Sequence, residues 1–369
     1  MSLSQLVEMS NFYGSNEEFV VAGGGNTSFK EDSVMYVKGS GTTLATITRE
    51  QFVKMDLTKL SAMLEKDYPD DDKSRESEAL KDMMAAKLPG EEGKRPSVEA
   101  VLHAIFPQKF VLHTHPAIVN GLTCGKNGAE ACQRVFSTSA VWIPLTKPGY
   151  VLAAECRNLF EEYKHLTGRP PKAAILQNHG LFTAADTIQE IDSLTNDVVC
   201  KLKDQITEMP DFTEIHVDMS RAQELVAELR ALFGEGEDAY AIFCSNAQAL
   251  KFTADKSSIR ELLEPFTPDH IVYCKHRPLF LEDGGNCRKK FDNYKSTHGF
   301  APRIAAIEKL GFIALGKTAK EAETARLLFL DAMKVAVYAR SFGGVNPLPD
   351  DFVRFILNWE AEHYRQKTL

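Results

Sequence analysis

The chain has 369 residues, of which 44% are hydrophobic and 25% are charged, a composition typical of folded globular proteins. That length suffices for one large or two medium domains, and we expect two. The formal net charge of −8 makes the average surface repel nucleic acid and anionic membranes, so we expect neither as a partner.

Localisation is predicted from the apolar and cysteine patterns. No run of about 18 apolar residues occurs, and the first ten residues lack a basic segment followed by an apolar core. The seven cysteines are an odd number, widely scattered, and include no Cys-X-X-Cys pair. This pattern suits a reducing compartment, and we therefore expect a cytoplasmic protein.

Two glycine-rich turns lie near the N-terminus. We expect a strand over residues 19–22, a turn over 23–28, a second strand over 34–37 and a second turn around Ser40 and Gly41. Backbone N–H groups in such turns can bind an anion. Ordinary hairpin connections would explain the turns equally well.

A helix is predicted over residues 98–106, after Pro96 and Ser97. Its spacing places Glu99 in the first turn and His103 one turn later on the same face. A carboxylate within reach of a substrate carbon can move a proton, so Glu99 is a candidate acid/base.

Three histidines are candidate metal ligands. A buried strand over 110–112 leads into His113 and His115, which can aim at one point because residues two apart in a strand point to the same side. A second buried strand, 173–176, ends just before His179, and a long helix begins near Thr187. Three neutral imidazoles with one open position can hold a Lewis-acidic zinc ion, although a His-X-His pair alone is more often an ordinary surface or core pair.

The second half of the chain resembles the first. After a predicted helix over 215–237, Pro268–Val272 aligns with Pro107–Val111, and Pro302–Gly311 aligns without a gap with Pro171–Gly180. Two blocks in the same order indicate a duplication. Chance similarity between short apolar strands is the alternative.

This alignment predicts a second copy without a metal. Cys274, His276 and Leu310 would occupy the positions of the three histidines, and leucine offers no donor. The strands ending near Cys274 and Lys309 should then lie side by side in one sheet.

Several motifs occur in an order that resembles the class II aldolase/adducin family, which includes fuculose-phosphate and rhamnulose-phosphate aldolases and ribulose-phosphate 4-epimerase. The motifs are Gly25-Asn26-Thr27-Ser28, Ser40-Gly41, Pro96-Ser97-X-Glu99-X-X-X-His103, His113-Thr114-His115-Pro116 and Asn178-His179-Gly180. They cover roughly residues 1–210. A closer likeness, which includes Thr267-Pro268-Asp269-His270, extends to the aldolase part of bifunctional rhamnulose-phosphate aldolase/lactaldehyde dehydrogenases. No Gly-X-Gly-X-X-Gly follows a predicted strand, so we expect no dehydrogenase part in this sequence.

The resemblance implies an α/β protein with a three-layer α/β/α fold and a mostly antiparallel sheet. It implies a catalytic domain over 1–215, an α/β domain over 216–369, and a homo-oligomer acting on a small sugar phosphate. It also implies that Zn²⁺ or another divalent ion is bound by His113, His115 and His179, and that Glu99 is the acid/base. The residues implied to hold the substrate phosphate are Gly25, Asn26, Ser40, Gly41 and Ser97.

Two positions bear on the reaction. Val98 stands where the family often has a second serine, which removes one hydroxyl contact to phosphate. Glu99 matches the simple aldolases, whereas the epimerases and the bifunctional rhamnulose proteins have aspartate there, and this favours aldol cleavage without fixing the sugar. The expected reaction is cleavage of a ketose 1-phosphate, rhamnulose 1-phosphate or a similar one, to dihydroxyacetone phosphate and an aldehyde. A sugar-phosphate 4-epimerase and a non-catalytic adducin-like binding protein are the alternatives. For His103, a core histidine hydrogen-bonded to backbone is at least as well supported as a catalytic one.

Overall fold

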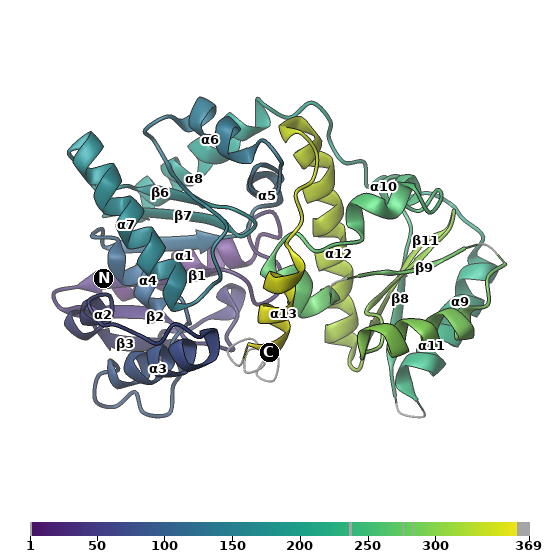
Figure 1. The fold of residues 1–369 in the computed structure, drawn as a ribbon, viewed down its shortest axis with the longest axis horizontal. Helices are drawn as coiled ribbons and strands as arrows, with labels where there is room; N and C mark the ends of the chain where they lie inside the picture. The colour runs from purple at the N-terminus through teal and green to yellow at the C-terminus, as the bar shows by residue number, and fades with distance from the viewer. Residues whose placement is uncertain (1, 236–237, 276, 283, 360–369) are drawn as a thin grey trace. The chain divides into compact units, whose positions relative to one another are not determined.

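The structure is a computed structural model that describes residues 2–235, 238–275, 277–282 and 284–359 (Figure 1). Contacts between Cα atoms divide the chain into two compact units. One comprises Met1–Thr123, Asn127–Gln205 and Asn358–Leu369, and the other Cys124–Lys126 and Ile206–Leu357. That 1–215 and 216–369 fold as separate domains stays a prediction.

The first unit is built on a seven-stranded sheet in the order β3-β2-β1-β4-β7-β6-β5. Every neighbouring pair is antiparallel except β5 and β6. The strands are β1 Asn26–Glu31, β2 Val34–Lys38, β3 Phe52–Asp56, β4 Phe110–Thr114, β5 Val141–Ile143, β6 Ala173–Leu176 and β7 Gly180–Ala185. The prediction of a mixed α/β fold with a mostly antiparallel sheet is therefore confirmed.

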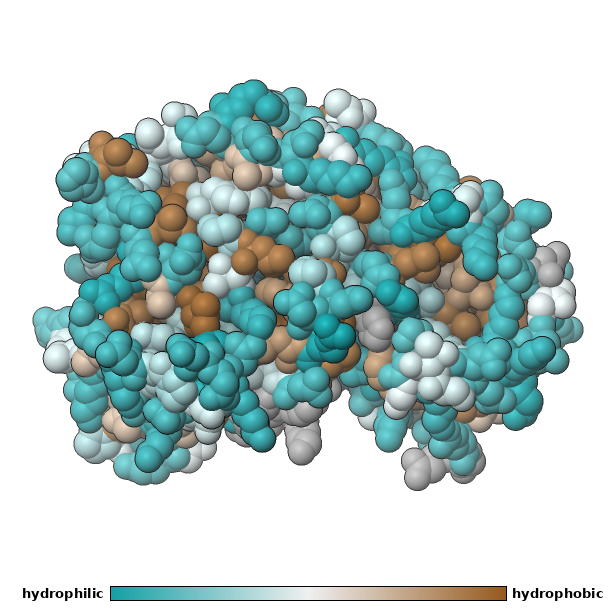
Figure 2. All heavy atoms as spheres, in the orientation of Figure 1, coloured by the Kyte–Doolittle hydropathy of each residue, from teal (hydrophilic) through white to brown (hydrophobic). Residues whose placement is uncertain are grey.

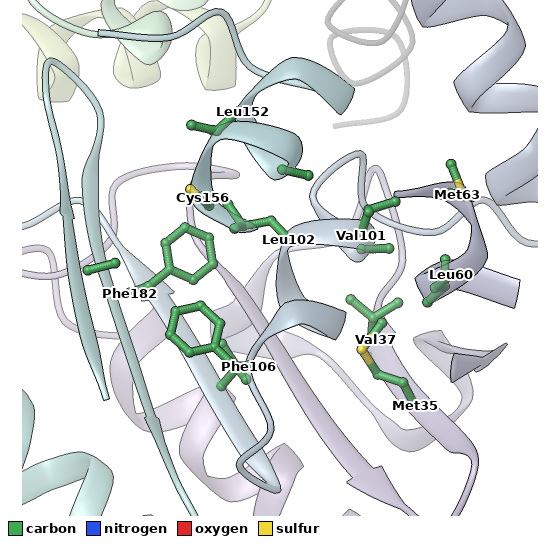
Figure 3. Packing of buried hydrophobic residues seen from close by; sticks show 14 of the residues in the cluster. Met35, Val37, Leu60, Met63, Val101, Leu102, Phe106, Leu152, Cys156 and Phe182 are labelled. Atoms are coloured by element: carbon green, nitrogen blue, oxygen red, sulfur yellow. The ribbon is translucent and has the colours of Figure 1, made fainter. Parts of the chain in front are cut away.

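Helices cover both faces of this sheet (Figure 1). They are α1 Ser2–Gly14, α2 Leu57–Met63, α3 Asp72–Ala85, α4 Ala100–Ile105, α5 Ala117–Thr123, α6 Gly128–Phe136, α7 Tyr150–Thr167 and α8 Ile188–Lys203, with short 3₁₀ turns at Leu44–Thr46 and Arg49–Gln51. Side chains alternate across β4 as a strand requires: Val111 packs with α4 and α7, and Leu112 packs with α1 and α8. Figure 3 shows the first of these cores, in which Phe106 and Phe182 stack beside Leu102 and Cys156. The result is the expected three-layer arrangement.

The predicted strand over 19–22 is wrong. The N–H groups of Phe19 and Val20 both bond to the carbonyl of Asn16, and Ala22 has a φ of 55°. These residues form turns, and the strand begins only at Asn26. Packing covers these apolar side chains in part: Val20 is buried, and the half-buried Phe19 contacts the ring of Tyr13 edge-on at 5.0 Å between centroids.

The second unit holds a four-stranded sheet in the order β8-β11-β10-β9. Its strands are β8 Tyr240–Cys244, β9 Leu279–Leu281, β10 Ile304–Ile307 and β11 Gly311–Gly316. Its helices are α9 Met219–Gly234, α10 Ala247–Phe252, α11 Cys287–His298 and α12 Ala319–Ala339, with shorter turns at Ser258–Leu262, His270–Cys274 and Arg340–Phe342. Helix α13, Asp350–Asn358, ends at the last residue but one that the structure describes.

This sheet repeats half of the larger one. The order β8-β11-β10-β9 matches β4-β7-β6-β5, with antiparallel, antiparallel and parallel pairs in the same sequence. The turn after β6 has Asn178 at a φ of 53°, and the turn after β10 has Lys309 at 59°. Threonine caps the helix that follows in both copies, Thr187 before α8 and Thr318 before α12. The matching order and turns support a duplication.

The predicted first alignment block is nevertheless wrong. His270–Cys274 forms a π-helical turn, so Pro268–Val272 is not a strand, and Val272 does not share a sheet with Ala306. A five-residue apolar run does not separate a buried strand from a buried helical turn. The counterpart of β4 is β8.

Strand pairing gives the correct counterparts of the histidines. His113 pairs with Phe182 in the first sheet, and Phe243 pairs with Ile313 in the second at the equivalent register. The positions of His113, His115 and His179 therefore correspond to Phe243, Ser245 and Leu310, and Cys274 is not a counterpart. His276 lies outside the described residues.

The surface in Figure 2 shows polar and charged side chains over most of the visible face, with apolar ones recessed between them. Within the part of the chain that the structure describes, no helix combines the length and apolar character that crossing a bilayer needs.

Candidate metal and substrate site

The three predicted histidines come together at one end of the first sheet. His113 is the fourth residue of β4, His115 follows the strand, and His179 lies in the turn between β6 and β7. Because β4 pairs with β7, this turn lies beside the end of β4. The Nε2 atom of His113 is 2.9 Å from Nε2 of His115 and 3.3 Å from Nε2 of His179. Each histidine offers a donor nitrogen within 4.8 Å of the other two.

The hydrogen bonding of His113 leaves the right nitrogen for a metal. Its Nδ1 lies 3.0 Å from the carbonyl oxygen of Leu181, an acceptor, so the ring proton sits on Nδ1 in the neutral form. Nε2 then presents a lone pair toward the other two histidines. The ring is also held by stacking on Phe182, at 4.0 Å between centroids and 11° between planes. Such support orients a metal ligand before the ion binds.

The backbone of the β6–β7 turn explains the residues beside His179. Asn178 has a φ of 53°, a left-handed conformation that asparagine tolerates better than most residues. At Gly180, a Cβ atom would lie 2.5 Å from the carbonyl oxygen of Thr114 and 2.7 Å from the His115 ring. Only glycine lets the turn approach β4 this closely.

Glu99 faces the histidine cluster. It occupies the N-cap position of α4, which starts two residues later than predicted. Its Oε1 atom is 3.5 Å from Nε2 of His113 and 3.4 Å from Nε2 of His179. Its other oxygen, Oε2, accepts a short hydrogen bond from the side-chain amide of Asn26. The carboxylate is 8% exposed, so it is shielded from bulk water.

Three of the five predicted phosphate-binding residues lie beside this cluster. Asn26 contacts Glu99 directly, and the Oγ atom of Ser97 accepts a hydrogen bond of 3.2 Å from the Glu99 backbone N–H. Gly25 has a φ of 69°, and a Cβ there would lie 2.8 Å from the carbonyl oxygen of His113. These three residues therefore border the site.

Ser40 lies beside the segment that leads to Ser97 and Glu99, and Gly41 follows it. The N–H of Ser40 donates to the carbonyl of Arg95 at 2.8 Å, and Gly39 forms an isolated bridge with Pro96. The second glycine turn thus runs beside residues 95–97.

His103 is a core residue. It is fully buried, and its Nδ1 lies 2.8 Å from the Oγ of Ser28, a side-chain partner where backbone was expected. Burial holds its pKa well below the usual range, with a further lowering by His113, Lys30 and Lys38. Its ring meets Phe182 edge-on at 5.4 Å.

Lys38, at the end of β2, was not among the predicted site residues. Its side chain is buried, and its ammonium donates to the carbonyl oxygens of Gly23 and Gly25, each at 3.1 Å. In the sequence, Lys38 directly follows the apolar run Val-Met-Tyr-Val. In the structure, both sides of this strand are largely buried. A charged residue there must find partners inside the protein.

These features define an α/β protein with three imidazole donors and one carboxylate gathered at the end of a mostly antiparallel sheet. The sequence model described as "Class II Aldolase and Adducin N-terminal domain" matches residues 4–195, more than half of the chain. The chain belongs to the class II aldolase and adducin family.

The chain is also similar, at low sequence identity, to a known protein. A Bacillus subtilis (strain 168) protein named "Uncharacterized oxidoreductase YuxG" is 23% identical over 409 aligned positions, which cover 98% of this chain. The chain spans only 58% of the length of that relative.

Among solved structures, the N-terminal class II aldolase domain of a conserved protein from Thermoplasma acidophilum is 26% identical, with a TM-score of 0.47, and covers 55% of this chain and 93% of that chain. The L-fuculose-1-phosphate aldolase of Thermus thermophilus is 13% identical, with a TM-score of 0.35, and covers 54% of this chain and 90% of that chain. Neither likeness assigns a role to a residue of this chain.

Proposed function

We propose that the protein is a metal-dependent class II aldolase that cleaves a ketose 1-phosphate to dihydroxyacetone phosphate and an aldehyde. The observation that carries the proposal is the convergence of three imidazole Nε2 atoms with the Oε1 atom of Glu99. Membership of the class II aldolase family supports the same reaction class.

His113, His115 and His179 fit a divalent ion, since all three present nitrogen donors and His113 is held in the tautomer that leaves Nε2 free of a proton. When bound, Zn²⁺ or a similar ion supplies Lewis-acid stabilisation of the negative charge that develops on the substrate oxygens.

Glu99 would carry the proton. In a retro-aldol cleavage the substrate hydroxyl loses a proton as the carbon–carbon bond breaks, and the carbon left behind must gain one. Because Asn26 holds Oε2, the other oxygen, Oε1, which faces the histidines, would exchange the proton with the substrate. The low exposure of the carboxylate limits exchange with water.

The experiment has two parts. The purified protein is first analysed for bound divalent metal and is then incubated with rhamnulose 1-phosphate and fuculose 1-phosphate. Dihydroxyacetone phosphate is measured by coupled reduction with NADH, and the aldehyde is measured separately. We expect close to one metal ion per chain and equal yields of the two products.

Other outcomes separate the alternatives. Conversion of a pentulose phosphate to its 4-epimer with no release of aldehyde would identify an epimerase. Protein that binds no divalent ion after metal is supplied, and turns over no substrate, would overturn the aldolase proposal and favour an adducin-like binding protein.

A further inference from the structure

A cavity of about 190 Å³ lies in the second unit beside the turn between β10 and β11. Leu310 of this turn lines the cavity, and Leu310 stands at the position that His179 has in the first unit. A single buried water needs only about 10–15 Å³, so this cavity has room for a small molecule.

The helices around this cavity correspond to those around the three histidines. Helix α9 precedes β8 as α4 precedes β4, and α11 lies between β9 and β10 as α7 lies between β5 and β6. In each unit the two helices pack together against the sheet. Asp218 is the N-cap of α9 and lines the cavity, whereas Glu99 is the N-cap of α4 and faces the histidines. The cavity therefore lies where the first unit has its candidate metal site.

The lining of the cavity does not suit a metal ion. In the part of the chain that the structure describes, the histidines of the first unit are the one group of three donors close enough to share an ion. The floor of the cavity is instead apolar, since the side chains of Leu225, Ile307 and Leu310 line it and are buried. Apolar carbon on a ligand would pack against this floor.

Charged side chains stand around the apolar floor. Among the described residues that line the cavity, three are acidic and two are basic: Asp218, Glu282, Glu308, Arg221 and Lys309. An anion such as phosphate would meet an excess of negative charge there. The charges therefore disfavour the kind of ligand that we propose for the first unit.

Two of the charged side chains already have partners that do not line the cavity. Arg221 donates to Glu224 at 3.2 Å, and Lys290 donates to Glu282 at 2.7 Å. A charged group of a ligand would compete with these partners. A hydroxyl group can add a hydrogen bond without displacing them, because a guanidinium has five donors and a carboxylate accepts several bonds.

Arg221 also breaks a local rule of helix formation. It is the third residue of α9, where the positive end of the helix dipole disfavours a cation. Residues that cost local stability in this way are expected at functional sites. The position of Arg221 at the edge of a cavity agrees with such a role.

We propose that this cavity is a second binding site, which takes a neutral polyhydroxylated molecule such as an unphosphorylated sugar. Arg221 and Glu282 bind its hydroxyl groups, and its C–H groups pack on the apolar floor. The inference is independent of the aldolase proposal, because every residue assigned to this site belongs to the second unit.

The test measures binding of unphosphorylated rhamnulose to the full-length, metal-loaded protein by calorimetry. We expect saturable binding by the wild type, and Arg221→Met should weaken it about tenfold or more, which is the usual effect of losing a hydrogen bond to a charged group. Because a cation at this position opposes the helix dipole, the variant should have an unchanged or higher Tm. Binding at wild-type strength, or a loss of binding together with a lowered Tm, would overturn the proposal.

Two further variants locate the binding. Arg230→Met is the matched control, since Arg230 is exposed and lies later in the same helix, and it should bind rhamnulose like the wild type. His113→Ala should also keep this binding, because the residue belongs to the first unit. Binding that is lost in His113→Ala and kept in Arg221→Met would place the sugar at the histidines and refute the second site.

Filling the cavity gives an independent check. Leu310→Trp would occupy the space above the floor and should abolish rhamnulose binding. If this variant does not fold, the comparison of Arg221→Met with Arg230→Met still decides the question.

Titrations with inorganic phosphate and with leucine test the class of ligand. We expect neither to bind in a way that Arg221→Met weakens. Phosphate binding that depends on Arg221 would identify an anion site, and leucine binding that depends on it would identify a site for a zwitterion. Either result without rhamnulose binding would overturn the assignment to a neutral ligand.

Discussion

Replacing Gly180 by alanine would place a methyl carbon between the β6–β7 turn and the end of β4. An ideal Cβ at this position lies 2.5 Å from the carbonyl oxygen of Thr114, 2.7 Å from Cδ2 of His115 and 3.3 Å from Cε1 of His113. The φ of Gly180 is outside the left-handed region, so the backbone itself accepts alanine. The cost comes from these contacts.

The size of the effect follows from the distances. Ordinary contact begins at 3.4 Å, so the His115 ring at 2.7 Å would have to move by about 0.7 Å. Metal–ligand distances vary by only about 0.2 Å in a competent site, so a shift of this size weakens one of three ligands. We expect metal affinity to fall at least tenfold, as it does when ligand orientation is disturbed, and stability to fall by about 1–3 kcal/mol from overpacking.

The assay measures Zn²⁺ affinity by competition with a chromophoric chelator and secondary structure by circular dichroism. Gly311→Ala is the control, because Gly311 is the equivalent residue of the second unit and a Cβ there would lie 2.4 Å from the carbonyl oxygen of Cys244. Its φ of 127° adds backbone strain. This variant should lose stability and keep its metal. Wild-type metal affinity in Gly180→Ala would refute the proposed geometry of the site.

Three further predictions concern the same unit. Glu99→Gln should keep the metal and lower turnover by roughly a hundredfold to ten-thousandfold, the usual contribution of a general acid/base, and equal turnover would remove Glu99 from the mechanism. His113→Ala should lose metal and activity with an unchanged circular dichroism spectrum, whereas retained metal at full activity would contradict the ligand assignment. Burial lowers the pKa of Lys30 to about 7, below its unfolded value of 10.5, so the unfolded chain binds the proton more strongly and stability should rise from pH 7 to pH 9. Relative to Lys30→Met, denaturant unfolding should show a gain of about 2 kcal/mol over this range, and a flat difference would contradict the lowered pKa.

The parts of the fold that could be predicted are those in which local pattern and burial agree. The strands before His113 and His179 were expected from apolar runs, and a long helix was expected from Thr187 onward. They occur as β4, β6 and α8. Residues 19–22 and 268–272 have similar apolar runs but form turns. Ala22 has a positive φ that interrupts the first segment, whereas the second is part of a helical turn that runs to Cys274 and is followed by Lys275 at a φ of 61°. Neither alanine nor lysine signals such a conformation.

The site could be predicted residue by residue only where a motif marks it. His113 and His115 follow from strand alternation, His179 from the end of a second buried strand and Glu99 from its place in the first turn of a helix. The phosphate-binding residues were added through the family resemblance. The contact between Asn26 and Glu99 spans 73 positions in the chain, and no local rule brings them together. Lys38 was missed because a lysine at a strand end is usually exposed, and only the coordinates show that its ammonium turns inward.

The repeated half-sheet separates what the fold needs from what the metal needs. In the second unit the left-handed turn at Lys309, the close glycine at Gly311 and the threonine cap of α12 all persist where Phe243, Ser245 and Leu310 replace the histidines. The backbone geometry that gathers the donors is therefore stable without any donor. For protein engineering, this unit is therefore a scaffold for a new metal site. The substitutions Phe243→His, Ser245→His and Leu310→His would place the same three ligands on a backbone that does not need them to fold.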